Sequence, residues 1–162
     1  MATDQVPISK QQRQRFIMEH QQAAGVDGDI SAGAGRKSLT LNTTLRNDIP
    51  GASRSGSQFI LPPGEYSVRG YVLIQNGGNQ QAFVHNLTAA SDDIPSSSSR
   101  SNQGSGDANA MPCIIDGDLN PTVTTTYELQ GEIETGGTFV SSDGWSGRAI
   151  EKYSRIEIER IA

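Results

Sequence analysis

Apolar and polar residues alternate with a period of two in several short segments, which is the pattern of β-strands. The clearest case is 65–75, in which every second residue from Tyr66 to Ile74 is apolar or glycine. The opposite face of this segment carries Tyr71 and Leu73, so both of its faces hold large apolar side chains. Similar patterns predict further extended segments at 38–45, 58–61, 80–88, 111–115, 124–134, 138–141 and 150–161.

Turn-forming residues separate these segments. The sequence PPG at 62–64 predicts a break, NGGN at 76–79 predicts a tight hairpin, and DGD at 116–118 predicts an acidic turn. Residues 91–110 are almost all Ser, Asn, Gly and Asp, which predicts a long flexible loop. Seven or eight short strands with turns between them indicate an all-β, antiparallel sandwich or barrel.

The N-terminal part of the chain is more ambiguous. Residues 1–15 are polar and are interpreted as a short extended arm, which leaves 16–162 as one domain. The stretch from Ser9 to Ala24 is rich in helix formers and begins with a capping-box pattern, which favours a helix. Its few large apolar residues make a poor helical stripe, however, so a short strand at 16–20 competes with the helix.

Composition indicates a small core. Leu, Ile, Val and Phe together form roughly a fifth of the 162 residues. So little apolar material leaves two interpretations open. Either the chain shares apolar surface with further copies of itself, or it is a monomer with many exposed loops.

Charge and cysteine content exclude several classes of protein. The formal net charge of −5 argues against a nucleic-acid binder. No apolar run is long enough to span a membrane, and residues 1–5 lack the features of a signal peptide. The single cysteine, Cys113, excludes an intrachain disulfide and a zinc site with several cysteines.

No residue pattern predicts catalysis, a metal or a cofactor. A pair of Cys113 with His85 is possible in principle, but a cysteine between proline and two isoleucines is typical of a small buried hydrophobe. The alternation of Asp116, Asp118 and Asn120 is that of a calcium loop, but proline replaces the required glycine. Glutamates such as Glu128, Glu132, Glu134, Glu157 and Glu159 alternate with their neighbours, which is typical of solvated strand faces. The sequence therefore predicts neither catalytic nor metal-binding nor cofactor-binding residues.

Several segments together resemble a phage-encoded jelly-roll family. The fold of that family is similar to the globular head of the first complement component and to tumour necrosis factor. The matching segments are FIME at 16–19, GVDG at 25–28, SAG at 31–33, RKSLTLNT at 36–43, SQFILPPGEY at 57–66, VHNLT at 84–88 and IEIER at 156–160. The chain departs from the family at 80–81, where two glutamines replace a histidine that the family often has, and in its longer serine-rich loop.

The resemblance implies a ten-stranded jelly roll that forms homotrimers, and it favours a strand over a helix at 16–20. On this basis Tyr71, Leu73 and Tyr153 are expected at the trimer interface. Such domains occur in phage virions as capsid decoration (cement) proteins and as receptor-binding tips of tail fibres. The short arm and the lack of a fibrous or coiled-coil shaft before the domain favour the decoration protein.

The expected function is therefore a homotrimer on the virion surface that binds the major capsid protein and stabilises the head by bridging its subunits. No nucleic acid, membrane or cofactor is expected as a partner. The residues expected to contact the capsid belong to the basic arm and its continuation: Lys10, Arg13, Arg15, Phe16 and Ile17. In the tail-fibre alternative, loops at 91–110 and 143–147 contact a host glycan, and Trp145 is the stacking ring.

Overall fold

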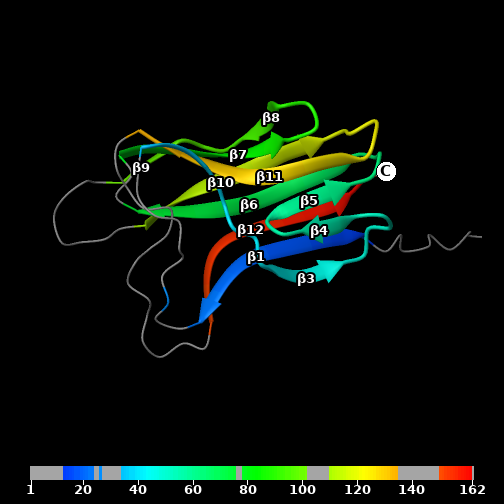
Figure 1. The fold of residues 1–162 in the computed structure, drawn as a ribbon, viewed down its shortest axis with the longest axis horizontal. Coiled ribbons are helices and arrows are strands. Elements are labelled where there is room, and N and C mark those ends of the chain that lie inside the picture. Colours follow the sequence, from blue (N-terminus) through cyan, green and yellow to red (C-terminus); the bar gives the residue numbers. More distant parts are fainter. Residues whose placement is uncertain are drawn as a thin grey trace, which may run out of the picture.

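The computed structural model describes residues 13–23, 26, 34–75, 78–101, 110–134 and 150–161. Twelve strands make up the regular structure of these residues, and no helix among them is long and apolar enough to cross a membrane. The strands are β1 Arg15–Ala23, β2 Gly35–Ser38, β3 Thr43–Asn47, β4 Ser53–Ser55, β5 Gln58–Leu61, β6 Tyr66–Gln75, β7 Gly78–Asn86, β8 Ser91–Pro95, β9 Ser99–Ser101, β10 Ala110–Leu119, β11 Thr125–Ile133 and β12 Ile150–Arg160 (Figure 1).

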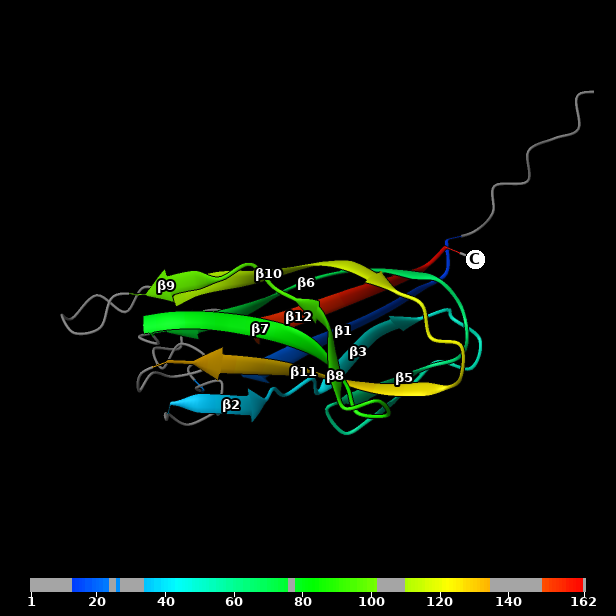
Figure 2. The ribbon, with the colours of Figure 1, turned by 90° about the horizontal axis from the view of Figure 1, so that it is seen from above.

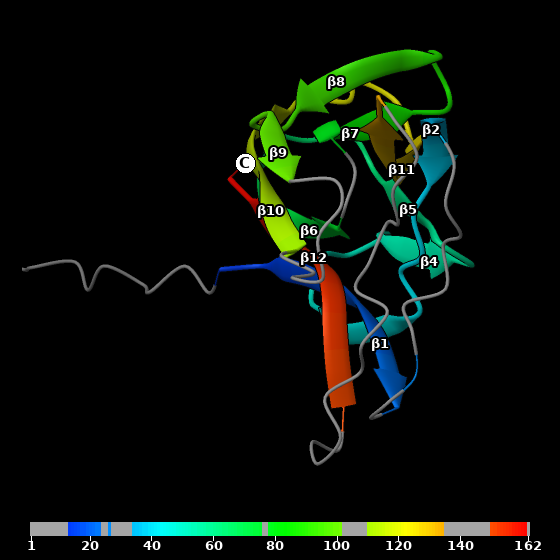
Figure 3. The same ribbon diagram turned by 90° about the vertical axis from the view of Figure 1, so that its left-hand side faces the viewer.

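The strands form two antiparallel sheets packed face to face, which is a jelly-roll sandwich. The first sheet has the order β10-β6-β12-β1-β3. The second has seven strands in which β4-β5-β11-β7-β8 are neighbours, while β2 also pairs with β11 and β9 with β7. Figure 3 shows β10, β6, β12 and β1 in one layer and β7, β11, β5 and β2 in the other. The all-β, antiparallel fold predicted from the sequence is confirmed.

The core lies between the sheets and is built by alternation. In β6 the face that carries Val68, Val72 and Ile74 is almost completely buried, whereas Tyr71 and Leu73 on the opposite face are half-buried. In β11 the buried residues Tyr127 and Leu129 face the same core, and the Tyr127 ring stacks on Phe59 at 5.4 Å. Every buried polar side-chain atom of the described residues has a hydrogen-bond partner.

The N-terminal segment forms a strand and not a helix. Strand β1 pairs with β12 on one side and with β3 on the other, so it lies inside the five-stranded sheet. Its residues Phe16 and Met18 are fully buried in the core. Burial of these two side chains and pairing with two strands outweigh the weak helix preference of the segment, because propensity contributes only tenths of a kcal/mol per residue.

Two expected connections differ from the structure. The NGGN sequence at 76–79 does not close a hairpin, because β6 belongs to the five-stranded sheet and β7 pairs with β11 in the other. The expected turn at 116–118 is part of β10, which pairs with β6 along its whole length. Asp116 and Asp118 therefore stand on the outer face of a strand, and Gly117 between them lies against Ile94 in the core.

The expected loop at 91–110 is also wrong in its first part. Residues 91–95 form β8 and 99–101 form β9, and both pair with β7. Polar sequences of this kind form strands here because the neighbouring strand supplies the backbone partners and only Ile94 needs to reach the core. Residues 102–109 lie outside the described residues, and Ala110 begins β10.

The start of β1 and the end of β12 lie at the same end of the sandwich (Figures 1 and 2). The backbone nitrogen of Arg160 donates to the carbonyl oxygen of Gln14 at 3.0 Å, which ties the two ends together. The connections between β7 and β8 and between β10 and β11 lie at this end as well. We call it the terminal end of the sandwich.

Candidate functional site

The outer face of the five-stranded sheet carries an exposed apolar area at its β10 edge. Ile114 lies opposite Tyr71, and Pro112 lies opposite Leu73, in the antiparallel register of β10 and β6. Ile114 is 48% exposed, Pro112 is exposed and the other two are half-buried. We call these four residues the apolar corner. A cluster of apolar side chains on a sheet face is typical of a surface that another protein covers.

The same sheet face continues into a row of charged residues near the terminal end. Arg15 contacts Glu157 at 3.0 Å and Glu159 at 3.2 Å, and Arg13 contacts Glu159 at 3.3 Å. Arg69 on β6 contacts Asp116 on β10 at 3.5 Å. Such exposed pairs contribute little to stability, typically about 0–1 kcal/mol each. Their alternating signs instead give the face a pattern that a partner surface could match.

Glu19 on β1 lies in the same cross-strand row as Tyr71, with Arg155 of β12 between the two, and it is completely buried. Its carboxylate accepts hydrogen bonds from Arg155 Nη1 at 2.7 Å and from Gln21 Nε2 at 2.7 Å, and it lies 3.0 Å from Lys152 Nζ. Burial by itself raises the pKa of Glu19, but the hydrogen bonds from Gln21, Lys152 and Arg155 outweigh it and hold the pKa below its ordinary value. Glu19 is therefore a charged group that the sheet face encloses.

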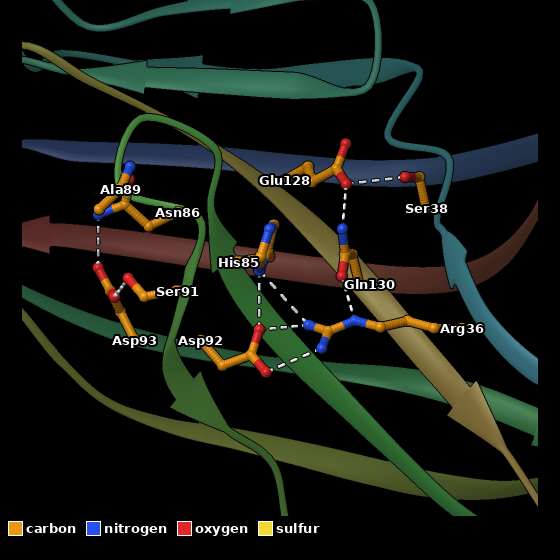
Figure 4. A network of polar contacts seen from close by, with 10 residues as sticks. All are labelled: Arg36, Ser38, His85, Asn86, Ala89, Ser91, Asp92, Asp93, Glu128 and Gln130. Carbon is orange, nitrogen blue, oxygen red and sulfur yellow. Dashed lines mark hydrogen bonds and ion pairs between the residues drawn. The ribbon is translucent and has the colours of Figure 1, made fainter.

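The outer face of the seven-stranded sheet carries a second polar network, centred on Arg36 (Figure 4). The guanidinium of Arg36 on β2 donates to both carboxylate oxygens of Asp92 on β8, with Nη1 to Oδ2 at 2.8 Å, and to Gln130 on β11. It also lies 4.4 Å from the ring centre of Phe83. His85 Nδ1 lies 2.8 Å from Asp92 Oδ1. The network thus links β2 and β8 across the two strands that separate them.

Glu128 on β11 extends the network to Ser38, a second residue of β2. It accepts hydrogen bonds from the Ser38 hydroxyl at 2.8 Å and from the Gln130 amide, and it is only 8% exposed. The expectation that Glu128 is a solvated residue is therefore wrong. Neighbouring polar side chains cover it, although it stands on the outer face of its strand.

A bulge in the β7–β8 pairing orients two consecutive aspartates. The register shifts between Val84 and His85, so that Asp92 pairs with His85 while Asp93 has no partner in the ladder. Asp93 accepts hydrogen bonds from Asn86 Nδ2 at 2.9 Å and from Ser91 Oγ at 2.7 Å (Figure 4). The two neighbouring carboxylates therefore belong to different sets of contacts.

Protonation of Asp92 is expected to weaken the fold. The hydrogen bonds from Arg36, with a smaller contribution from His85, lower the pKa of Asp92 to about 2, although burial opposes them. A carboxyl group with a depressed pKa stabilises the fold above its ordinary pKa of 3.8 and loses that contribution as the pH falls toward 2. Because solvent screens the pair, we expect a loss of about 1 kcal/mol. Urea unfolding of the wild type and of Asp92→Asn at pH 7, 4 and 2 measures this; a difference between the two proteins that does not shrink with falling pH contradicts it.

Of the residues expected to contact a capsid, those that the structure describes do not lie together in an arm. Arg13 is exposed and precedes β1, and Arg15 is the first residue of β1. Phe16 is fully buried in the core, and Ile17 is 8% exposed on the outer sheet face, in register with Glu157 and Arg46. The expectation that Phe16 and Ile17 contact the capsid is therefore wrong, because β1 pairs with two strands and both side chains are buried there. Lys10 lies outside the described residues.

The three residues expected at a trimer interface separate into two groups. Tyr71 and Leu73 lie on the outer sheet face, in the apolar corner. Tyr153 is only 4% exposed; its ring lies 5.4 Å from that of His20, and its hydroxyl donates to the Val26 carbonyl at 2.7 Å. Tyr153 is therefore a core residue and not part of the exposed face. Trp145, the expected glycan-stacking ring, lies outside the described residues.

The described residues bring no catalytic set together. Cys113 faces the core, and burial raises the pKa of its thiol, whereas His85 stands on the outer face of the opposite sheet. The prediction that Cys113 is a buried hydrophobe is confirmed. Within the described ranges no group of three His, Cys, Asp or Glu side chains could hold a metal ion.

Sequence reasoning did not single out Ile114, Glu19 or Arg36. Ile114 follows Cys113 in an apolar run, and only the pairing of β10 with β6 shows that it faces outward. The partners of Glu19 and Arg36 are distant in sequence, such as Arg155 for the first and Asp92 for the second. For Glu19 the sequence offers one indication of an unusual position, because this charged residue directly follows the apolar residues 16–18.

Comparison with known proteins supports the fold. No protein-family model and no curated protein matches this sequence. Among the solved structures that match is the crystal structure of murine APRIL, with a TM-score of 0.58 and 8% sequence identity. The match covers 92% of this chain and 99% of the APRIL chain. At this identity the likeness concerns the fold alone: the chain has a jelly roll like that of tumour necrosis factor.

Proposed function

We propose that the protein is a structural protein of a bacteriophage virion, a homotrimeric decoration protein that binds the capsid surface and stabilises it. The observation that carries the proposal is the apolar corner, because Ile114, Pro112, Tyr71 and Leu73 lie next to one another on the outer face of two paired strands. The tumour-necrosis-factor-like fold supports it as well, since the resemblance of the sequence to the phage jelly-roll family implies trimers.

In the proposed assembly, three copies bring their apolar corners together around a threefold axis. Each copy hides the exposed part of Ile114 and covers Tyr71, which a single chain leaves half-buried. Shared burial of this kind adds core that the small apolar content of one chain does not supply. Arg13 and Arg15 of each copy, on the outer face of the five-stranded sheet, then face in a common direction and contact the major capsid protein.

Several weak contacts of this kind combine into tight attachment. A trimer that holds one capsid contact keeps its other two copies at high effective concentration over the lattice. Because Arg13 and Arg15 pair with Glu157 and Glu159, this face presents both signs of charge, and a capsid surface with the complementary pattern favours the correct orientation of encounter. Bridging neighbouring subunits then opposes their separation, which is how the trimer stabilises the head.

Replacement of Ile114 by arginine tests the assembly. We expect sedimentation equilibrium at micromolar concentration to show a trimer for the wild type and a monomer for Ile114→Arg, because the charge opposes burial of the apolar corner. Leu87→Arg is the matched control, since Leu87 is 38% exposed in the β7–β8 turn, and this variant remains a trimer. A wild-type protein that is a stable monomer at these concentrations refutes the proposed assembly.

Capsid binding is tested separately. Phage heads that lack the protein are mixed with purified trimer, and co-sedimentation is measured for the wild type, for a chain without residues 1–12 and for Arg13→Glu/Arg15→Glu. We expect both variants to stay trimeric and to lose binding. Trimers that bind host cells and not heads would replace this proposal with the tail-fibre alternative.

A further inference from the structure

The β7–β8 turn and the β10–β11 connection enclose a small cleft at the terminal end of the sandwich. Its volume is about 270 Å³, just below the usual range for the pockets of drug-sized ligands. Asn86, Thr88 and Asp93 line it from one side, Asn120 and Val123 from the other. The cleft lies apart from the apolar corner, on which no part of the following argument depends.

Asp93 is the principal acceptor in the cleft. Its two hydrogen bonds, from Asn86 and Ser91, occupy only part of the capacity of an ionised carboxylate, which has about four acceptor positions. No described residue forms an ion pair with Asp93, in contrast to Asp92 beside it, which Arg36 neutralises. Asp93 thus has free acceptor positions and no cationic partner among the described residues.

Hydroxyl groups supply donors next to this carboxylate. The Thr88 Oγ1 accepts a hydrogen bond from the backbone nitrogen of Thr126 at 3.0 Å, which leaves its own proton to donate. Tyr127 lies beneath and is 1% exposed; burial, with a contribution from the charge of Asp93, raises the pKa of its hydroxyl to about 12. The hydroxyl therefore keeps its proton throughout the physiological range.

Apolar surface completes the cleft. Val123 is 58% exposed at its rim, and Ala89 is exposed in the turn opposite. The lining thus combines a carboxylate acceptor, an amide, several hydroxyls and a small apolar contact in a volume for one small ring. The lack of any cationic residue in this lining disfavours an anion, and the single carboxylate disfavours a divalent metal ion.

From this combination we propose that the cleft binds a single neutral sugar ring. A sugar presents neighbouring hydroxyls that donate to a carboxylate and accept from side-chain hydroxyls, and its C–H face packs on apolar side chains. Asp93 accepts from two neighbouring hydroxyls of the ring, Thr88 and Asn120 bond its other oxygens, and Val123 contacts its C–H face. The ring is either a free monosaccharide or the terminal residue of a glycan.

Saturation-transfer NMR with the full-length protein tests this, using methyl glycosides of glucose, galactose, mannose and N-acetylglucosamine as probes. We expect at least one probe to bind with millimolar affinity and Asp93→Asn to weaken it about tenfold or more, as loss of a charged hydrogen-bond partner does. Asp92→Asn is the matched control and leaves binding unchanged, because that neighbouring carboxylate belongs to the Arg36 network. A glycan array then shows whether the sugar is recognised free or at the end of a chain.

A second pair of variants distinguishes a loss of binding from a loss of folding. Thr88→Ser keeps the hydroxyl and retains binding, whereas Thr88→Val removes it and weakens binding, with thermal melting to verify that both are folded. The proposal is overturned if no glycoside binds at tens of millimolar, or if Asp92→Asn and Asp93→Asn have equal effects. Preferential binding of methylammonium over every glycoside overturns it too, because it would make the cleft a site for amines.

Discussion

Gly70→Ala is expected to destabilise the protein by about 3 kcal/mol or more, or to prevent folding. Gly70 stands in the middle of β6, between β10 and β12. A Cβ atom at this position would lie 2.4 Å from the carbonyl oxygen of Arg155 and 3.3 Å from the Cα of Ile156. Both are backbone atoms of a paired strand, which cannot move away without breaking the ladder.

Gly117→Ala is the comparison variant, for which we expect a smaller loss of stability than for Gly70→Ala. The Cβ at position 117 would meet the Cγ2 of Ile94 at 2.9 Å, which belongs to a side chain and not to the backbone of a paired strand, so we expect a smaller loss of about 1–2 kcal/mol. Urea unfolding at pH 7 measures both. Equal losses for the two variants would show that the β6–β12 backbone yields as easily as a side chain, contrary to the proposed reason.

Arg155→Met is expected to destabilise the protein by about 2 kcal/mol, because it removes the nearer of the two cationic partners of a buried carboxylate. Glu19 is completely buried, and Arg155 Nη1 bonds it at 2.7 Å. Lys152 remains at 3.0 Å and is itself 47% exposed, so it limits the loss but does not replace the lost hydrogen bond. Denaturant unfolding at pH 7 of the wild type and the variant measures the change.

The double variant Glu19→Met/Arg155→Met distinguishes a charge effect from lost packing. Removing both groups leaves no unpaired buried charge, so we expect it to recover most of the stability that Arg155→Met loses. The contribution of Glu19 to the free energy of unfolding also depends on pH. Because the folded pKa of Glu19 is depressed, its contribution is present above its ordinary pKa of 4.5 and is lost as the pH falls below it. A double variant that is less stable than Arg155→Met contradicts this explanation.

Local sequence information found most of the strands but assigned their partners poorly. The period-two pattern of 65–75 and 124–134 predicted β6 and β11 within one residue at each end. The turn residues at 76–79 suggested that β6 and β7 pair, yet the two strands lie in opposite sheets. Turn propensity governs only where the chain changes direction, whereas pairing depends on backbone partners more distant along the chain.

The candidate sites show the same division. Tyr71 and Leu73 were visible as an apolar second face of one strand, but their neighbour Ile114 was not, because the register of β10 against β6 brings it there. Asp92 and Asp93 are adjacent in sequence and chemically identical. The bulge opposite Val84 and His85 places Asp92 in contact with Arg36 and Asp93 in the lining of the cleft.

The sequence by itself determined an all-β chain, the positions of long strands such as β6, β11 and β12, the buried role of Cys113 and the surplus of apolar residues on one strand face. These properties follow from side-chain alternation and turn chemistry, which act over a few residues. The tertiary structure decided that Phe16 belongs to the core, that Glu19 is an enclosed charge, and that residues 91–101 join a sheet. Each of these depends on a strand from a distant part of the chain, which supplies the hydrogen bonds or covers the side chain.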